Sequence, residues 1–200
     1  MATSMSKLDS LMIQRTALAL RERVGDEPCV VLVSSAADGE GKSLVARALA
    51  RALAVQTPGR VGLVSLQPEV SAPAGPGWRE LLESGQVPAG TDTDGLWELP
   101  AGGGALAASS DVALFRIDAV AQAVQALRAH RALVLVDGPS LAACGALVPQ
   151  VDQILLVVNS QRTTDRALSK AMQAANVAPE RVAGVVLNRQ ASVPGWLRGT

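Results

Sequence analysis

The sequence is poor in aromatic residues and in histidine. It contains no tyrosine, one phenylalanine and one histidine, and aromatic residues make up 2% of its 200 residues. The single histidine, His130, lies far along the chain from Ser34 and Ser35, which leaves a Ser-His triad little to build on. His130 ends a predicted helix, where exposure or a contact with the helix dipole is expected rather than catalysis.

Cysteine is also scarce. Neither Cys29 nor Cys144 lies in a CxxC pair or beside a second metal-ligating residue. This pattern is typical neither of a disulfide framework nor of a metal site, so we expect two buried, reduced thiols.

Neither sign of charge is in excess, and no long apolar run is present. Eighteen basic residues balance eighteen acidic ones without a cluster of lysine and arginine, which argues against nucleic-acid binding. The longest apolar runs, such as Ile154–Val158, fall far short of the ~18 residues that span a bilayer. The N-terminus, MATSMSKLDS, lacks a signal-peptide core, and we expect a cytoplasmic protein.

The composition, 48% hydrophobic and 18% charged, predicts one folded domain over residues 1–200. Helices are predicted at Leu8–Val24 (within an N-terminal element, residues 1–25), Leu44–Val55, Trp78–Gly85, Asp111–His130 and Thr163–Asn176. Strands are predicted at Cys29–Ser35, Arg60–Leu66, Ala132–Asp137, Gln153–Val158 and Arg181–Asn188. A further short apolar segment is found at Leu96–Leu99. The strands are continuous apolar runs, as in a parallel sheet covered on both faces. We therefore predict a three-layer α/β fold with a mainly parallel sheet of about seven strands and helices on both faces.

Segments rich in proline and glycine are predicted to be loops. Pro68–Gly77 and Leu99–Gly104 are interpreted as surface loops at the carboxyl ends of the strands, where such sheets bind ligands. The last residues, 190–200, are expected to form a loose tail, in which Trp196 and Leu197 either pack on the domain or dock a partner.

A glycine-rich loop, ADGEGKS at Ala37–Ser43, separates the first apolar strand from an alanine-rich helix. Such a loop turns backbone N–H groups toward phosphate oxygens, its lysine reaches the outer phosphates and its serine ligates Mg²⁺. The predicted nucleotide-binding residues here are Asp38, Gly39, Glu40, Gly41, Lys42, Ser43 and Leu44. Ala36 replaces the first glycine of the full pattern, and a turn without ligand is the alternative.

The lysine of this loop comes from a lysine-poor background. Lys7, Lys42 and Lys170 are the chain's lysines, and the other fifteen of its eighteen basic residues are arginines. A compact ammonium suits a phosphate cradle better than a planar guanidinium. Further along, LVLVDGPS has the form of a strand whose terminal Asp137 orients Mg²⁺, although Asp-Gly-Pro is also an ordinary turn.

Together with QILLVVNSQRTT and VAGVVLNR, these motifs resemble the bacterial tyrosine kinase (BY-kinase) family, a branch of the MinD/ParA-like P-loop ATPases that serves capsular and exopolysaccharide assembly. The resemblance covers about Leu11 to Arg189 and implies a P-loop NTPase fold that binds ATP or ADP with Mg²⁺, the metal held by Ser43 and Asp137. It also implies that Asn188, with Arg189, lies beside the adenine, unless Asn188 simply caps its strand.

The sequence departs from the family at its second acidic motif. Ser65 and Gln67 stand where BY-kinases carry two aspartates, and neither can act as a carboxylate base. Loss of a general base commonly costs about 10²–10⁴-fold in rate. Glu69 is displaced by two residues and is a poor substitute. Asp137 is therefore the best candidate for a catalytic residue, and the catalytic set is otherwise unknown.

Other family features are missing too. The tyrosine-rich C-terminal cluster is absent, so the chain cannot phosphorylate its own tyrosines. The Glu-x-x-Arg-x-x-Arg ring-assembly segment is not found, which argues against ring formation. Neither Ala36 nor Ala37 supplies the signature lysine with which MinD/ParA proteins contact a partner's nucleotide.

The resemblance and these departures predict a degenerate, pseudokinase-like nucleotide-binding protein. It is expected to be a regulatory or scaffold subunit of exopolysaccharide synthesis or export, bound to a membrane polysaccharide co-polymerase or another export component at the inner face of the plasma membrane, with self-association as a further option. The alternatives are a slow ATPase or kinase acting on a partner's tyrosines, helped by Asp137 with Glu40 or Glu69, a MinD/ParA-like positioning ATPase, and a structural protein that binds no nucleotide.

Overall fold

The computed structural model describes residues 7–66, 75–102 and 116–188. The helices are α1 (Lys7–Val24), α2 (Lys42–Gln56), α3 (Trp78–Ser84), α5 (Ile117–His130) and α6 (Asp165–Ala174), with short 3₁₀ turns η2 (Leu141–Ala143) and η3 (Pro179–Arg181). The strands are β1 (Cys29–Ser34), β2 (Val61–Ser65), β3 (Thr91–Thr93), β4 (Leu96–Leu99), β5 (Leu133–Asp137), β6 (Gln153–Asn159) and β7 (Val182–Asn188).

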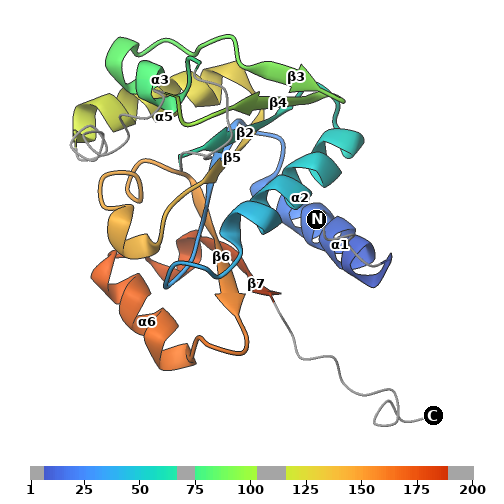
Figure 1. The fold of residues 1–200 in the computed structure, drawn as a ribbon, viewed down its shortest axis with the longest axis vertical. Coiled ribbons are helices and arrows are strands. Elements are labelled where there is room, and N and C mark those ends of the chain that lie inside the picture. Colours follow the sequence, from blue (N-terminus) through green and yellow to red (C-terminus); the bar gives the residue numbers. More distant parts are fainter. Residues whose placement is uncertain (1–6, 67–74, 103–115, 189–200) are drawn as a thin grey trace.

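The strands form one seven-stranded sheet in the order β3-β4-β2-β5-β1-β6-β7. Every neighbouring pair is parallel except β3 with β4, which is antiparallel. The predicted mainly parallel α/β sheet of about seven strands is therefore confirmed (Figure 1). Parallel pairing places the carboxyl ends of β1, β5 and β6 side by side at one edge of the sheet.

Two apolar layers cover the sheet, one on each face. On one face Ala17 and Leu20 of α1 and Leu49 and Leu53 of α2 pack against the sheet, all of them at most 2% exposed. On the other face lie α3 and α5, whose buried residues include Leu81 and Leu127, and the segment after β5 (Figure 1). Strand β1 is buried along its whole length, which explains its uninterrupted apolar sequence.

The structure adds a hairpin that the sequence analysis did not predict. Thr91–Thr93 and Leu96–Leu99 pair antiparallel across a two-residue turn, in which Asp94 and Gly95 have φ of 51° and 78°. Positive φ at both turn residues is the geometry that Asp-Gly favours. The sequence Asp94-Gly95 was the available signal, but the exposed and polar β3 lacks the apolar pattern of a strand.

Several boundaries differ from the prediction by a few residues. Helix α2 begins at Lys42, two residues before the predicted start, and α5 begins at Ile117 within the described residues rather than at Asp111. Residues 111–115, the tail 190–200, and most of the predicted loop Pro68–Gly77 lie outside the described residues.

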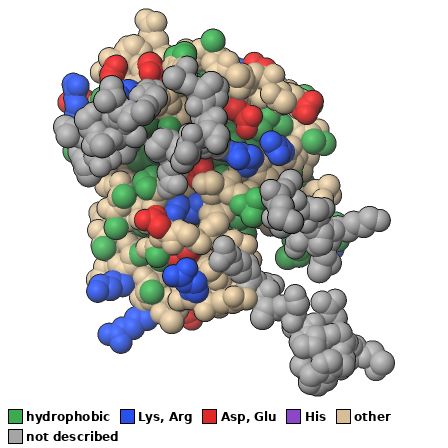
Figure 2. Space-filling model, viewed as in Figure 1, with side chains coloured by type: hydrophobic (Ala, Val, Ile, Leu, Met, Phe, Trp, Pro, Cys, Tyr) green, Lys and Arg blue, Asp and Glu red, His purple; other side chains and the backbone are tan. Residues whose placement is uncertain are grey.

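Charged side chains of both signs are scattered over the face of the molecule shown in Figure 2. Within the three described ranges, none of the helices is both long and apolar enough to cross a membrane. Both cysteines are buried and free, as predicted. Burial is the main cause that raises the pKa of Cys29 to about 12 and that of Cys144 to about 11.

Candidate functional site

The glycine-rich loop connects the carboxyl end of β1 to the start of α2, between β5 and β6. Gly39 and Gly41 have φ of 77° and 91°, a left-handed conformation that side chains with a Cβ rarely adopt. Gly41 is the N-cap of α2, and the first turn of α2 contains no acidic residue. Because the first N–H groups of a helix have no acceptor within it, this end of α2 favours an anion.

Glu40 fixes the back of the loop. Its side chain is 3% exposed. One carboxylate oxygen, Oε1, accepts hydrogen bonds from the Ala37 N–H at 3.0 Å and the Thr163 hydroxyl at 2.9 Å. The other, Oε2, accepts the Asn159 N–H at 3.0 Å. Glu40 thus ties the loop to the end of β6 and to the segment before α6, and its carboxylate is engaged by three donors rather than poised as a base.

Asn188, at the end of β7 and the register partner of Asn159, contacts the same loop. Its amide nitrogen donates to the Glu40 carbonyl oxygen at 2.8 Å. A Cβ built on Gly41 would collide with this amide nitrogen, so Gly41 permits the close approach of β7 to the loop. The expected contact of Asn188 with adenine stays a prediction.

Asp137 is 4% exposed and ends β5, next to β1 in the sheet. In the β2–β5 pair, Ser65 is the register partner of Asp137. The sheet position beside Asp137 therefore carries a hydroxyl side chain and no carboxylate. Asp137 and the loop residue Ser43 both have side-chain oxygen atoms, which are the ligands that Mg²⁺ takes in proteins.

Lys42 and Asp38 form an ion pair within the loop. The Lys42 ammonium lies 3.4 Å from Asp38 Oδ1, and the two side chains are 5% and 80% exposed. The loop thus holds a buried cation beside a carboxylate that faces solvent.

The remaining predicted site residues are less informative. Leu44, in the first turn of α2, is 63% exposed, and its contact with nucleotide stays a prediction. Arg189, Gln67 and Glu69 lie outside the described residues. His130 is exposed and stacks edge-on against Trp97, with the ring centroids 4.6 Å apart. Partial burial, followed by the charge of Arg131, lowers the pKa of His130.

Two residues of the site were not singled out from the sequence. Asn159 and Thr163 lie in the segment NSQRTT, which carried part of the family resemblance but received no role. The available signal was a polar residue, Asn159, directly after the buried apolar run of β6, on a strand next to β1. Their partnership with Glu40 depends on a contact more than 100 residues apart along the chain, which the sequence alone does not reveal.

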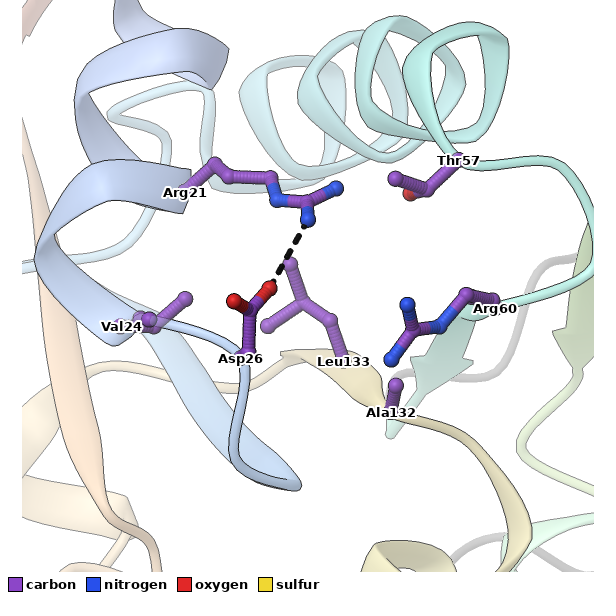
Figure 3. A pocket seen from close by; sticks show the side chains of 8 residues that line it. Arg21, Val24, Asp26, Thr57, Arg60, Ala132 and Leu133 are labelled. Atoms are coloured by element: carbon purple, nitrogen blue, oxygen red, sulfur yellow. Dashed lines mark hydrogen bonds and ion pairs between the residues drawn. The ribbon is translucent and has the colours of Figure 1, made fainter.

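A small pocket lies at the other end of the sheet, where β1, β2 and β5 begin (Figure 3). Its lining includes Arg21 in the last turn of α1 and Asp26 just after that helix, which are paired at 3.1 Å, and Thr57 and Arg60 before β2. Its volume of about 20 Å³ holds little more than a water molecule. This pocket is therefore far too small for a nucleotide, for which the exposed loop before α2 is the better candidate.

No protein-family model and no curated protein sequence matches the chain. Its fold is nevertheless similar to those of solved kinase domains. The VpsO kinase domain has a TM-score of 0.74 at 24% identity, covering 92% of this chain and 98% of that one. The kinase domain of the Escherichia coli tyrosine kinase ETK has a TM-score of 0.75 at 20% identity, covering 92% and 78%.

A ParA family ATPase from Chlorobium tepidum is more distant, with a TM-score of 0.63 at 12% identity, covering 80% of this chain and 72% of that one. The chain therefore has the fold of bacterial tyrosine kinase domains and, more broadly, of P-loop ATPases related to ParA. The expected fold is confirmed, while these identities leave activity to be argued from the site.

Proposed function

We propose that this chain binds ATP or ADP with Mg²⁺ at the loop of residues 37–43 and acts as a regulatory or scaffold subunit of bacterial exopolysaccharide synthesis or export, with little or no turnover. The observation that carries the nucleotide-binding part is the placement of Lys42 and Ser43 at the start of α2, after a left-handed Gly41, with the buried Asp137 at the end of β5, the strand next to β1.

The residues present fit a magnesium nucleotide. The Ser43 hydroxyl and the Asp137 carboxylate would hold Mg²⁺, and Lys42 would contact the outer phosphates. Bound Mg²⁺ would neutralise phosphate charge. A solved cobyrinic acid a,c-diamide synthase from Mycobacterium smegmatis, similar in fold at a TM-score of 0.59, contains a bound ATP analog and magnesium.

Weak turnover is proposed from the carboxylates that the site lacks. Ser65 occupies the strand position beside Asp137, and a hydroxyl there is a poor base at neutral pH. Glu40 cannot easily replace it, because three hydrogen bonds hold its buried carboxylate behind the loop. The role in polysaccharide export, with a membrane co-polymerase or another export component as partner, rests on the family resemblance.

Calorimetric titration with ATP and ADP, with and without Mg²⁺, tests nucleotide binding. We expect Lys42→Ala to weaken binding by at least about tenfold, equivalent to ~1.4 kcal/mol, and Asp137→Ala to remove the dependence on Mg²⁺. Lys170→Ala, on the exposed face of α6, is the matched control and should bind as the wild type does. Identical titrations for Lys42→Ala and Lys170→Ala would refute the assignment of the loop.

Turnover is tested separately. Phosphate release from Mg-ATP should stay far below that of an intact kinase and should not respond to Lys42→Ala. Turnover at ordinary kinase rates that disappears in Lys42→Ala, or phosphotyrosine on a co-expressed partner, would favour the alternative of an active ATPase or kinase.

A further inference from the structure

The loop that is proposed to bind phosphates carries more negative than positive charge. Between Ala36 and Ser43 the charged residues are Asp38, Glu40 and Lys42, two carboxylates against one ammonium. Asp137 adds a third carboxylate at the end of the adjacent β5. A polyanionic ligand must therefore approach a site whose own charges oppose it.

The three carboxylates lie in different environments. Glu40 is turned to the back of the loop and accepts hydrogen bonds from Ala37, Asn159 and Thr163. Asp137 is buried at its strand end. The Asp38 side chain, by contrast, is 80% exposed and forms an ion pair with the Lys42 ammonium. Its Oδ1 lies 3.4 Å from the ammonium that a phosphate oxygen would also contact.

The exposed fractions of the pair explain why Asp38 takes this position. Lys42 is 5% exposed, and a desolvated ammonium is costly unless an anion or another acceptor compensates it. Asp38 Oδ1, 3.4 Å from the ammonium, provides that anion from within the same loop.

We propose that Asp38 is a specificity-determining residue that competes with phosphate for Lys42 and thereby favours magnesium-loaded over metal-free nucleotides. This inference rests on the proposed nucleotide binding and goes beyond it. A nucleotide without metal meets the Asp38 carboxylate directly and must displace it from Lys42. Mg²⁺ offsets the phosphate charge, so the repulsion from Asp38 is smaller for the metal complex.

The variant Asp38→Asn tests the competition, because asparagine keeps the shape of the side chain and removes its charge. We expect it to bind metal-free ATP more tightly than the wild type by about two- to fivefold, the range of an exposed ion pair, with a smaller gain for Mg-ATP. Asp26→Asn is the matched control. It removes an aspartate that is 88% exposed and paired with Arg21 at 3.1 Å, at the other end of the sheet.

A second measurement examines the ion pair without nucleotide. Protein labelled with ¹³C in lysine should give three Cε signals, one each for Lys7, Lys42 and Lys170, and Lys42→Arg identifies the relevant one. Asp38→Asn should shift the Lys42 signal and leave the other two in place. Mg-ATP added to the wild type should shift the same signal.

The outcomes separate this inference from the proposed function. Tighter binding of metal-free ATP by Asp38→Asn, or binding that appears only in that variant, supports the competition. Wild-type binding that depends on Lys42 but is unchanged or weakened in Asp38→Asn, or an unmoved Lys42 signal, overturns it while nucleotide binding stands. Absence of nucleotide binding in the wild type and in Asp38→Asn overturns both.

Discussion

Replacing Glu40 by glutamine tests whether this residue holds the loop as the structure indicates. Glutamine has the same shape but offers one acceptor oxygen where the carboxylate offers two. If that oxygen keeps the Ala37 and Thr163 donors, the new NH₂ group faces the Asn159 N–H, which the carboxylate now accepts at 3.0 Å. A hydrogen bond to a charged group contributes about 1.5–3 kcal/mol, and a buried donor left unpaired costs about 1–3 kcal/mol.

We therefore expect Glu40→Gln to lower the free energy of unfolding by about 3 kcal/mol. For a domain of this size that corresponds to a fall in Tm of roughly 6–12 °C, measured by calorimetry or circular dichroism. Removing a buried charge can also stabilise a protein, but the Asn159 N–H that loses its acceptor favours the opposite sign here.

Glu83→Gln is the control, because Glu83 is an exposed residue of α3. Its expected change is within about 0.5 kcal/mol. If the two variants melt at the same temperature, the reasoning about the Glu40 network is wrong.

Three further predictions concern other parts of the molecule. Gly90→Ala should destabilise the protein by more than about 1 kcal/mol in urea unfolding, because Gly90 has φ of 64° and a Cβ there would collide with the Trp97 indole; an unchanged midpoint would contradict this. The folded-state pKa values of Cys29 and Cys144, about 12 and 11, lie above that of an unfolded thiol. Their neutral forms therefore stabilise the native state fully below about pH 8.5, and this contribution is lost as pH rises toward 11 and 12. The Tm should accordingly fall more steeply above about pH 9 in the wild type than in a variant with both cysteines replaced by alanine. Parallel curves of Tm against pH would contradict the raised pKa values of the two thiols. Asn188→Ala should weaken ATP binding more than GTP binding if Asn188 contacts the base as the resemblance implies, whereas equal losses would restrict it to holding the loop.

The sheet could be predicted from the sequence because burial leaves a strong local signal. Strands such as β1 and β5 are covered on both faces and so consist of continuous apolar residues. The start of α2 was placed late because Lys42, buried in the structure, is polar in the sequence. β3 was missed because three exposed residues, Thr91–Thr93, carry no apolar pattern and pair only across the hairpin.

The candidate site could be predicted only in its contiguous part. Gly39, Gly41, Lys42 and Ser43 follow one another in a recognisable motif, and Asp137 ends an apolar run. The engagement of Glu40 with Asn159 and Thr163 arises from the pairing of β1 with β6, which brings distant segments together. The ion pair of Lys42 with Asp38 depends on the turn of the loop, which residue spacing does not specify.

The Glu40 network also bears on how binding of a ligand at the loop would affect the rest of the protein. A loop held from behind by three hydrogen bonds has little conformational freedom left to lose when phosphate arrives in front. Binding of a ligand at the loop would then mainly change the charge around Lys42, while the backbone conformation stays the same. A partner protein that distinguishes the nucleotide-bound from the free form would accordingly respond to the charge of the surface around this loop rather than to the movement of a segment.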